Sequence, residues 1–308
     1  MMAVEMRREI KQREAPATAL RRGVFDLGCA AFKQSFPVIA KDIPLEGFYV
    51  CPLCLRAFGE EALRLLTREH VPPRSVGGHR LVLTCRECNS AGGHETDSHA
   101  RKEADLFDFA AGRLKEIKAG LRTTSGQVPI RLSAAPGGVL AIIVPKAAST
   151  TAQATVESDF GGSVGEGNWE GFTFKVVFAP FSTKRAAASW LRSAYLAFFA
   201  ALGYRFILRP ELDDVRAKIK DPECEHPRTF RIIRREPSEP MLIRIDGPTE
   251  FCSYAMLYGR NMVFLPRDGD GEFYIRLTKH PDTEATLSGI LQFPWPRRAT
   301  FALDLVAR

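Results

Sequence analysis

The pattern of apolar and polar positions between residues 65 and 90 predicts a definite order of elements. Short apolar runs at 65–66 and 81–83 enclose a stretch that prolines and glycines interrupt at 72–78. Such punctuation is typical of a loop between two strands. The next segment, 88–90, reads Cys-Asn-Ser and favours the start of a helix, because Asn and Ser side chains accept hydrogen bonds from free backbone N–H groups. The pattern therefore predicts strand, loop, strand and helix in that order.

Helical spacing of apolar residues follows this segment. Residues 99–121 carry an apolar stripe and charges on the opposite face, which predicts a helix ended by Gly120. The most apolar run, 186–202, is short for a membrane span and contains Arg192, so we expect a buried core helix that Gly203 ends. Residues 1–47 are expected to be partly helical.

The remainder alternates in the manner of strands. It predicts an α+β domain with a mostly antiparallel sheet around one central apolar helix, a loose Gly- and Ser-rich loop at 147–167 and a short helix at 210–220. The predicted strands cover 139–144, 172–178, 204–208, 229–234, 241–246, 251–257, 261–265, 273–277, 288–292 and 300–306.

A chain of 308 residues is long enough for more than one domain. The pattern predicts an N-terminal helical segment at 1–47, a small module with its following helix at 48–122, and an α+β domain at 123–308. The sequence leaves the task of this last domain open.

The net charge of +7 suits an anionic partner. Within 51–100, however, six arginines balance six acidic residues, so the excess positive charge lies elsewhere. The charged N-terminus has no apolar segment typical of a secretory signal, and we therefore expect a cytoplasmic protein without a membrane partner.

Cysteines supply the most specific chemical signal. Cys51 and Cys54 form one C-x2-C pair, and Cys85 and Cys88 form a second. Two such pairs are typical of a structural zinc site, in which four thiolates surround the ion tetrahedrally. The alternative is four unrelated buried thiols. The scattered cysteines, namely Cys29, Cys224 and Cys252, are interpreted as ordinary small apolar residues.

These residues together resemble the HNH endonuclease family, which has the ββα-metal fold, and in particular its four-cysteine branch that includes a phage recombination endonuclease. The resemblance covers roughly residues 48–100 and rests on Cys51, Cys54, Glu69, His70, Pro72, Gly77, Gly78, Cys85, Cys88 and Asn89.

The resemblance implies a division of roles. His70 would act as the general base that takes a proton from the attacking water, since the pKa of an imidazole lies near operating pH. Glu69 and Asn89 would hold one catalytic Mg²⁺ or Mn²⁺ through oxygen. Glu69 and His70 are adjacent, so a regular strand would direct them to opposite faces, and the strand must be distorted if they serve one site.

The sequence departs from the family pattern at two positions. Glu69 stands where many members have Asp, and Arg80 stands where the family usually has Asn. Arg80 is a candidate phosphate contact, as are Arg74 and Arg86. His94 is a weaker candidate ligand, whereas His79 and His99 are interpreted as surface or packing residues.

The resulting prediction is a metal-dependent DNA endonuclease. A nuclease for RNA or branched DNA and a zinc module that binds nucleic acid without cutting it remain alternatives. A homodimer partner or a companion defence or phage protein is also left open.

Overall fold

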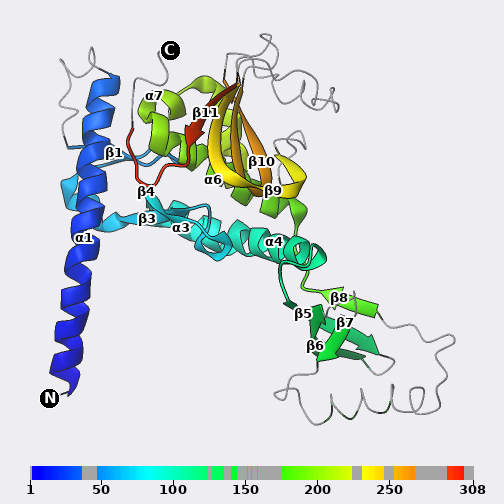
Figure 1. Ribbon diagram of the computed structural model, residues 1–308. Helices are drawn as coiled ribbons and strands as arrows, with labels where there is room; N and C mark the ends of the chain where they lie inside the picture. The colour runs from blue at the N-terminus through cyan, green and yellow to red at the C-terminus, as the bar shows by residue number, and fades with distance from the viewer. Residues whose placement is uncertain are drawn as a thin grey trace. The chain divides into compact units, whose positions relative to one another are not determined.

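The structure is a computed structural model that describes residues 2–36, 47–123, 126–134, 140–143, 175–223, 231–245, 253–267 and 290–301, together with 151, 154 and 158. It is a mixed α+β protein with antiparallel sheets (Figure 1). The chain forms two compact units, residues 1–100 with 184–308, and residues 101–183. These units divide the chain at other positions than the predicted domains.

A small ββα module opens the first unit after the N-terminal helix. Its elements are β1 (Tyr49–Val50), β2 (Ala57–Phe58), η1 (Glu60–Leu65), β3 (Leu66–Val71), η2 (Arg74–Val76), β4 (His79–Cys85) and α3 (Arg86–Gly92). β3 and β4 are antiparallel, so the predicted order of strand, loop, strand and helix is confirmed. The helix begins at Arg86 rather than at 88–90, because Cys85 in extended conformation is its N-cap.

The loop between β3 and β4 depends on two glycines. Gly77 has φ +93°, a left-handed conformation that favours glycine, and a Cβ at Gly78 would lie 1.6 Å from the Pro72 carbonyl oxygen. Side chains at either position would therefore disturb the turn that returns the chain into β4.

The helix predicted over 99–121 ends early. A π-helical turn, η3 (Gly93–Asp97), leads into α4 (Ser98–Ala110), and Gly112 with φ +70° then reverses the chain. Residues 116–123 form strand β5 instead, because they alternate between a buried and an exposed face and pair along their whole length with β6. The prediction was wrong beyond residue 110.

The second unit contains a four-stranded antiparallel sheet. Its strands are β5 (Glu116–Thr123), β6 (Gly126–Ala134), β7 (Leu140–Ile143) and β8 (Lys175–Phe178), in the order β7-β6-β5-β8. Phe109 of α4 packs on Leu121, Ile130 and Leu132 of the sheet to form a separate small core. The strands predicted at 139–144 and 172–178 are confirmed where the structure describes them, whereas the loop predicted at 147–167 lies almost entirely outside the described residues.

Residues 183–220 are mostly helical. The helices are α6 (Thr183–Leu202), α7 (Tyr204–Ile207), η4 (Pro210–Leu212) and α8 (Asp213–Lys220). α6 is the predicted central apolar helix, and most of its residues are buried. The strand predicted at 204–208 was wrong: Gly203 at φ +76° turns the chain, and the apolar residues that follow are buried as the short helix α7.

A three-stranded antiparallel sheet packs beside α6 (Figure 1). It consists of β9 (Arg231–Ile245), β10 (Ser253–Pro266) and β11 (Ile290–Pro294), in the order β10-β9-β11. Four of the predicted strands are therefore two long ones. β9 accommodates Pro237 and Pro240 because it is irregular there, with extra residues opposite the segment of β10 around Gly259. The strand predicted at 273–277 and residues 302–306 lie outside the described residues, and 300–301 are not a strand.

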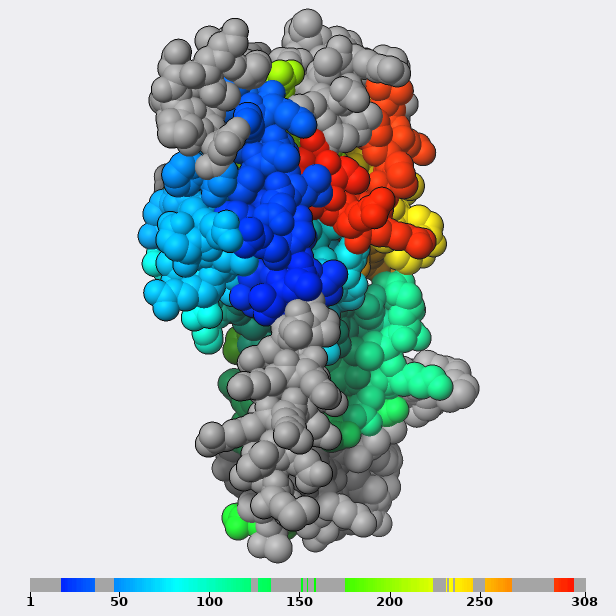
Figure 2. Space-filling model, turned by 90° about the vertical axis from the view of Figure 1, so that its left-hand side faces the viewer, coloured from blue at the N-terminus to red at the C-terminus, as the bar shows by residue number. Residues whose placement is uncertain are grey.

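The N-terminal helix α1 (Met2–Ser35) belongs to the same core. Its buried residues Phe25 and Ala31 lie on the side that contacts β1, β4 and α7. Figure 2 shows the C-terminal part of α1 (blue) at the surface, between the module (light blue) and the residues after 290 (red). Among the described residues, no helix has both the length and the apolar character required to cross a membrane.

Candidate functional site

The four cysteines of the two C-x2-C pairs converge in the module. Their Sγ atoms all lie within 4.8 Å of one another, and the Sγ atoms of Cys54 and Cys85 are 3.8 Å apart. Tetrahedral zinc with Zn–S bonds of about 2.3 Å requires sulfurs about 3.8 Å apart. The donor set and its spacing therefore fit a structural zinc ion.

The turn that carries the first pair is held by the backbone. The Leu55 N–H donates to the Cys51 carbonyl at 2.9 Å, and Leu55 has φ +59° although it is not a glycine. The Cys85 N–H donates to the Cys51 Sγ at 3.4 Å, and the Arg56 guanidinium donates to the Cys85 Sγ at 3.5 Å. Donors directed at sulfur favour thiolates, which are the metal-binding form.

The cysteine pKa values agree with this arrangement. Hydrogen bonding with Cys51 is the main cause that lowers the pKa of Cys54 to about 4 and the pKa of Cys85 to about 6. The pKa of Cys51 rises, because it donates its proton to the neighbouring sulfurs. Thiolates are thus present in the cluster at neutral pH, as zinc binding requires.

The module is anchored to helices far away in the sequence. The Tyr195 hydroxyl of α6 donates to the Pro52 carbonyl between the first two cysteines at 2.8 Å. The Tyr204 hydroxyl of α7 donates to the Val50 carbonyl at 3.0 Å and accepts from the Val50 N–H at 3.1 Å. The cysteine turn therefore depends on α6 and α7 for its position.

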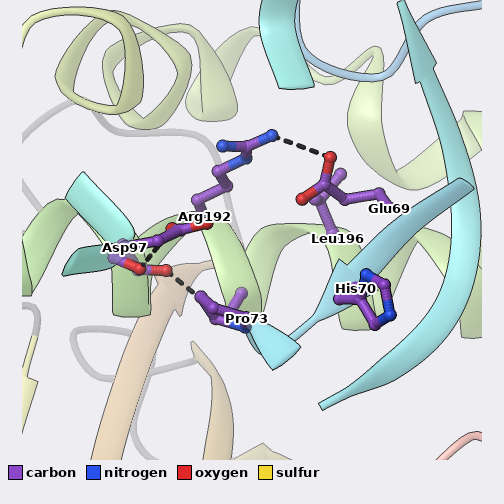
Figure 3. A pocket seen from close by; sticks show the side chains of 8 residues that line it. Glu69, His70, Pro73, Asp97, Arg192 and Leu196 are labelled. Carbon is purple, nitrogen blue, oxygen red and sulfur yellow. Dashed lines mark hydrogen bonds and ion pairs between the residues drawn. The ribbon is translucent and has the colours of Figure 1, made fainter. Parts of the chain in front are cut away.

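Glu69 and His70 line one pocket, and the strand that faces them carries a bulge. On β3 the register advances by one residue from Glu69 to His70, whereas on β4 it advances by two, from Val82 to Arg80. Leu81 is the extra residue, and the alternation of faces is broken there. Both side chains line a pocket with Pro73, Asp97, Ser189 and other residues of α6 (Figure 3). The irregularity lies in β4, whereas Glu69 and His70 are consecutive residues of β3.

Glu69 is buried at 5% exposure and is held by two donors. The Thr84 hydroxyl donates to its Oε2 at 3.0 Å, and the Arg192 Nη2 donates to the same oxygen at 2.9 Å. Burial raises the pKa of Glu69, and the charge of Arg192 opposes this rise. Figure 3 shows the guanidinium directed at the carboxylate.

His70 is partly exposed beside a group of arginines. Burial lowers the pKa of His70, and the positive charges of Arg80, Arg74 and Arg68 lower it further. The imidazole is therefore neutral at neutral pH, which is the state required to accept a proton.

Asn89 lies on α3 near the face of β3 that carries Glu69. Its Nδ2 donates to the Thr67 hydroxyl at 2.7 Å. Thr67 and Glu69 are two residues apart before the bulge, so they point to the same face of the strand. Asn89 and Glu69 thus share one side of β3.

The other predicted residues lie at the edges of this site. Arg80 is exposed and pairs with His70 across the two strands. Arg74, Arg86 and His94 are exposed as well. The His79 Nε2 lies 3.0 Å from the Pro296 carbonyl oxygen, which agrees with the predicted packing role. Cys29 is half-buried, whereas Cys224 and Cys252 lie outside the described residues.

The fold adds residues to the pocket to which the sequence assigned no role. Asp97 accepts a hydrogen bond from the Ser189 hydroxyl of α6 at 2.9 Å, and burial raises the pKa of Asp97. Arg192 is 4% exposed. One signal for Arg192 was present in the sequence. An arginine within the most apolar helix of the chain is expected to be buried, and a buried charge needs a partner of opposite charge.

Fold and site together define a four-cysteine ββα module with a histidine and a carboxylate at its pocket, and with an amide group that contacts β3 from α3. Residues 51–105 match the family model described as HNH endonuclease, and the chain therefore contains an HNH endonuclease domain in this region, with the four-cysteine cluster inside it. This domain indicates a nuclease with a nucleic-acid substrate. Comparisons with curated proteins and with solved structures gave no match.

Proposed function

We propose that this protein is a metal-dependent endonuclease that hydrolyses phosphodiester bonds in DNA. The observation that supports the proposal most strongly is the shared pocket of Glu69 and His70, a buried carboxylate and an imidazole that are neighbours in sequence. A solely structural zinc module has no need for a neutral histidine beside a buried carboxylate.

His70 is the proposed general base. It accepts a proton from the water whose oxygen bonds to phosphorus, while the bond from phosphorus to the 3′ oxygen breaks. The products are a 5′-phosphate and, once the leaving oxygen gains a proton, a 3′-hydroxyl. The low pKa of His70 keeps the imidazole neutral for this role.

Glu69 and Asn89 are the proposed ligands of a divalent ion. Carboxylate and amide oxygens suit Mg²⁺ or Mn²⁺, and the Asn89 amide nitrogen already donates to Thr67, which leaves its oxygen for a cation. Such an ion, when bound, supplies Lewis-acid stabilisation of the charge on phosphate.

Arginines beside His70 are the proposed phosphate contacts. Arg74 and Arg80 are exposed, and both act on His70 through their charges. Guanidinium groups bind phosphate oxygens well and carry no base specificity by themselves. This favours recognition of the nucleic-acid backbone near the base.

The test uses full-length, zinc-loaded protein on supercoiled plasmid with Mn²⁺, with Mg²⁺ and with EDTA. We expect metal-dependent nicking or linearisation that His70→Ala slows by about 10²–10⁴-fold, while zinc content stays at one ion per chain. Parallel arms with single-stranded RNA and a four-way DNA junction test the alternatives. Cleavage of only one of these would replace plasmid DNA as the substrate, and binding without any cleavage would leave a non-catalytic zinc module.

A further inference from the structure

Arg192 connects α6 to the two elements that carry the proposed ion ligands. Its Nη2 donates to Glu69 Oε2 on β3 at 2.9 Å and to the Cys88 carbonyl on α3 at 3.1 Å. Cys88 directly precedes Asn89. One buried guanidinium from outside residues 51–105 therefore holds β3 and α3 at the positions where their ligands are located.

The two oxygens of the Glu69 carboxylate have different surroundings. Both Arg192 and the Thr84 hydroxyl donate to Oε2. Within the part of the chain that the structure describes, no hydrogen bond reaches Oε1. Carboxylates that bind metal are commonly oriented by hydrogen bonds of this kind, and losing such partners typically weakens metal binding or activity.

The guanidinium is also confined sterically. Gly92 lies against it, and a Cβ at this position would be 1.0 Å from Arg192 Nη1. The side chains of Arg192 and Glu69 are only 5% and 6% exposed. The Arg192 head group can therefore leave its place only by breaking buried contacts.

We propose that Arg192 is a positioning residue for the divalent-ion site: it holds Oε2 of Glu69 and fixes β3 against α3, so that Glu69 Oε1 and Asn89 are presented together to the ion. This inference rests on the proposed function, because it assigns those two residues as ligands. It makes the nuclease site composite, with the HNH domain supplying the ligands and α6 supplying their orientation.

The test measures Mn²⁺ affinity by titration with electron paramagnetic resonance detection, in full-length zinc-loaded protein without nucleic acid. Arg192→Lys keeps the positive charge but loses the planar guanidinium that donates to both the Glu69 carboxylate and the Cys88 carbonyl. We expect the Mn²⁺ dissociation constant to rise about 10–100-fold. Plasmid cleavage by this variant should recover at high Mn²⁺. Thr84→Val, which removes the second donor to Oε2, should act in the same direction.

Arg216→Lys is the matched control. Arg216 is similarly buried, at 6% exposure, and its guanidinium donates to the Tyr195 hydroxyl and the Ile207 carbonyl, away from the pocket. It should change stability and leave Mn²⁺ affinity unchanged. If Arg192 had only a structural role, Arg192→Lys would likewise change stability and leave the Mn²⁺ affinity unchanged.

An unchanged Mn²⁺ dissociation constant in Arg192→Lys, with zinc retained, would overturn the inference. Tighter binding would overturn it too, since Arg192 would then compete with the ion. If Arg192→Lys does not fold, Thr84→Val and Gly92→Ala provide the same comparison. Wild-type protein that neither binds Mn²⁺ nor cleaves would refute the proposed function itself. Cleavage that is equal in wild type and variants at limiting Mn²⁺ refutes only the role of Arg192.

Discussion

Gly92 and Gly93 form a pair of adjacent positions at which the same substitution should have opposite effects. Both residues are in right-handed helical conformation, with φ −58° and ψ −47° at Gly92 and φ −60° and ψ −42° at Gly93. A Cβ at Gly93 meets nothing within 4 Å among the described residues, whereas a Cβ at Gly92 would collide with the Arg192 guanidinium. Backbone conformation is thus matched, and only the buried ion pair differs.

The magnitudes follow from helix propensity and burial. Alanine in place of glycine in a helix gains about 1 kcal/mol, which both variants receive in principle. Breaking a buried ion pair costs about 3–5 kcal/mol, and Gly92→Ala displaces the guanidinium from a fully buried Glu69. We therefore expect Gly93→Ala to gain up to about 1 kcal/mol and Gly92→Ala to lose about 2–4 kcal/mol.

The assay is urea denaturation of zinc-loaded protein, followed by tryptophan fluorescence. Trp190 in α6, at 3% exposure, reports on the region around Arg192. Combining Gly92→Ala with Arg192→Met is the internal control, because without the guanidinium the added methyl group should cost no more than at Gly93. Equal midpoints for the two alanine variants would refute the steric argument, as would an unchanged cost of Gly92→Ala in the Arg192→Met background.

Five further variants have expected outcomes. Cys88→Ser, or removal of zinc with a strong chelator, should unfold the first unit, because structural zinc contributes on the order of 10 kcal/mol; a zinc-free protein with the wild-type urea midpoint would contradict this. His70→Ala should lose about 10²–10⁴-fold in cleavage rate, and excess Mn²⁺ should not restore it. Excess Mn²⁺ should partly restore cleavage by Glu69→Ala, but this variant should also be less stable, since it leaves the buried Arg192 without its carboxylate partner. Arg80→Met removes a positive charge that lowers the pKa of His70, so the acid limb of the pH–cleavage profile should move to higher pH; a limb that stays in place would exclude His70 as the titrating base. Tyr204→Phe removes a buried hydroxyl that bridges backbone groups of β1, and calorimetry should show a loss of about 1–3 kcal/mol.

The local chemistry of the module could be predicted from sequence because it is encoded at short range. Each C-x2-C turn directs its two sulfurs toward one metal ion, so two such turns indicate a four-sulfur site. The apolar runs on either side of a proline- and glycine-rich loop define two strands. The resemblance to the HNH family assigned Glu69, His70 and Asn89, and the matched region 51–105 agrees with its extent.

Elements whose type depends on tertiary burial were predicted less well. Residues 116–123 have apolar positions that suit a helix and a strand alike, and pairing with β6 decided for the strand. The residues of α7 are rich in strand formers, yet the turn at Gly203 and burial against the core made them helical. Propensity is a weak prior in such cases, and long-range contacts outweigh it.

The composition of the pocket was decided by tertiary structure alone. The sequence contains Arg192 as an unexplained charge in an apolar helix, more than 100 residues after Glu69, and nothing in local spacing joins the two. Folding makes them a pair because a buried charge must be compensated, and the absence of a side chain at Gly92 leaves the space for it. The sequence by itself thus determined which groups could carry the chemistry, and the packing of α6 against β3 and α3 decided how they are held.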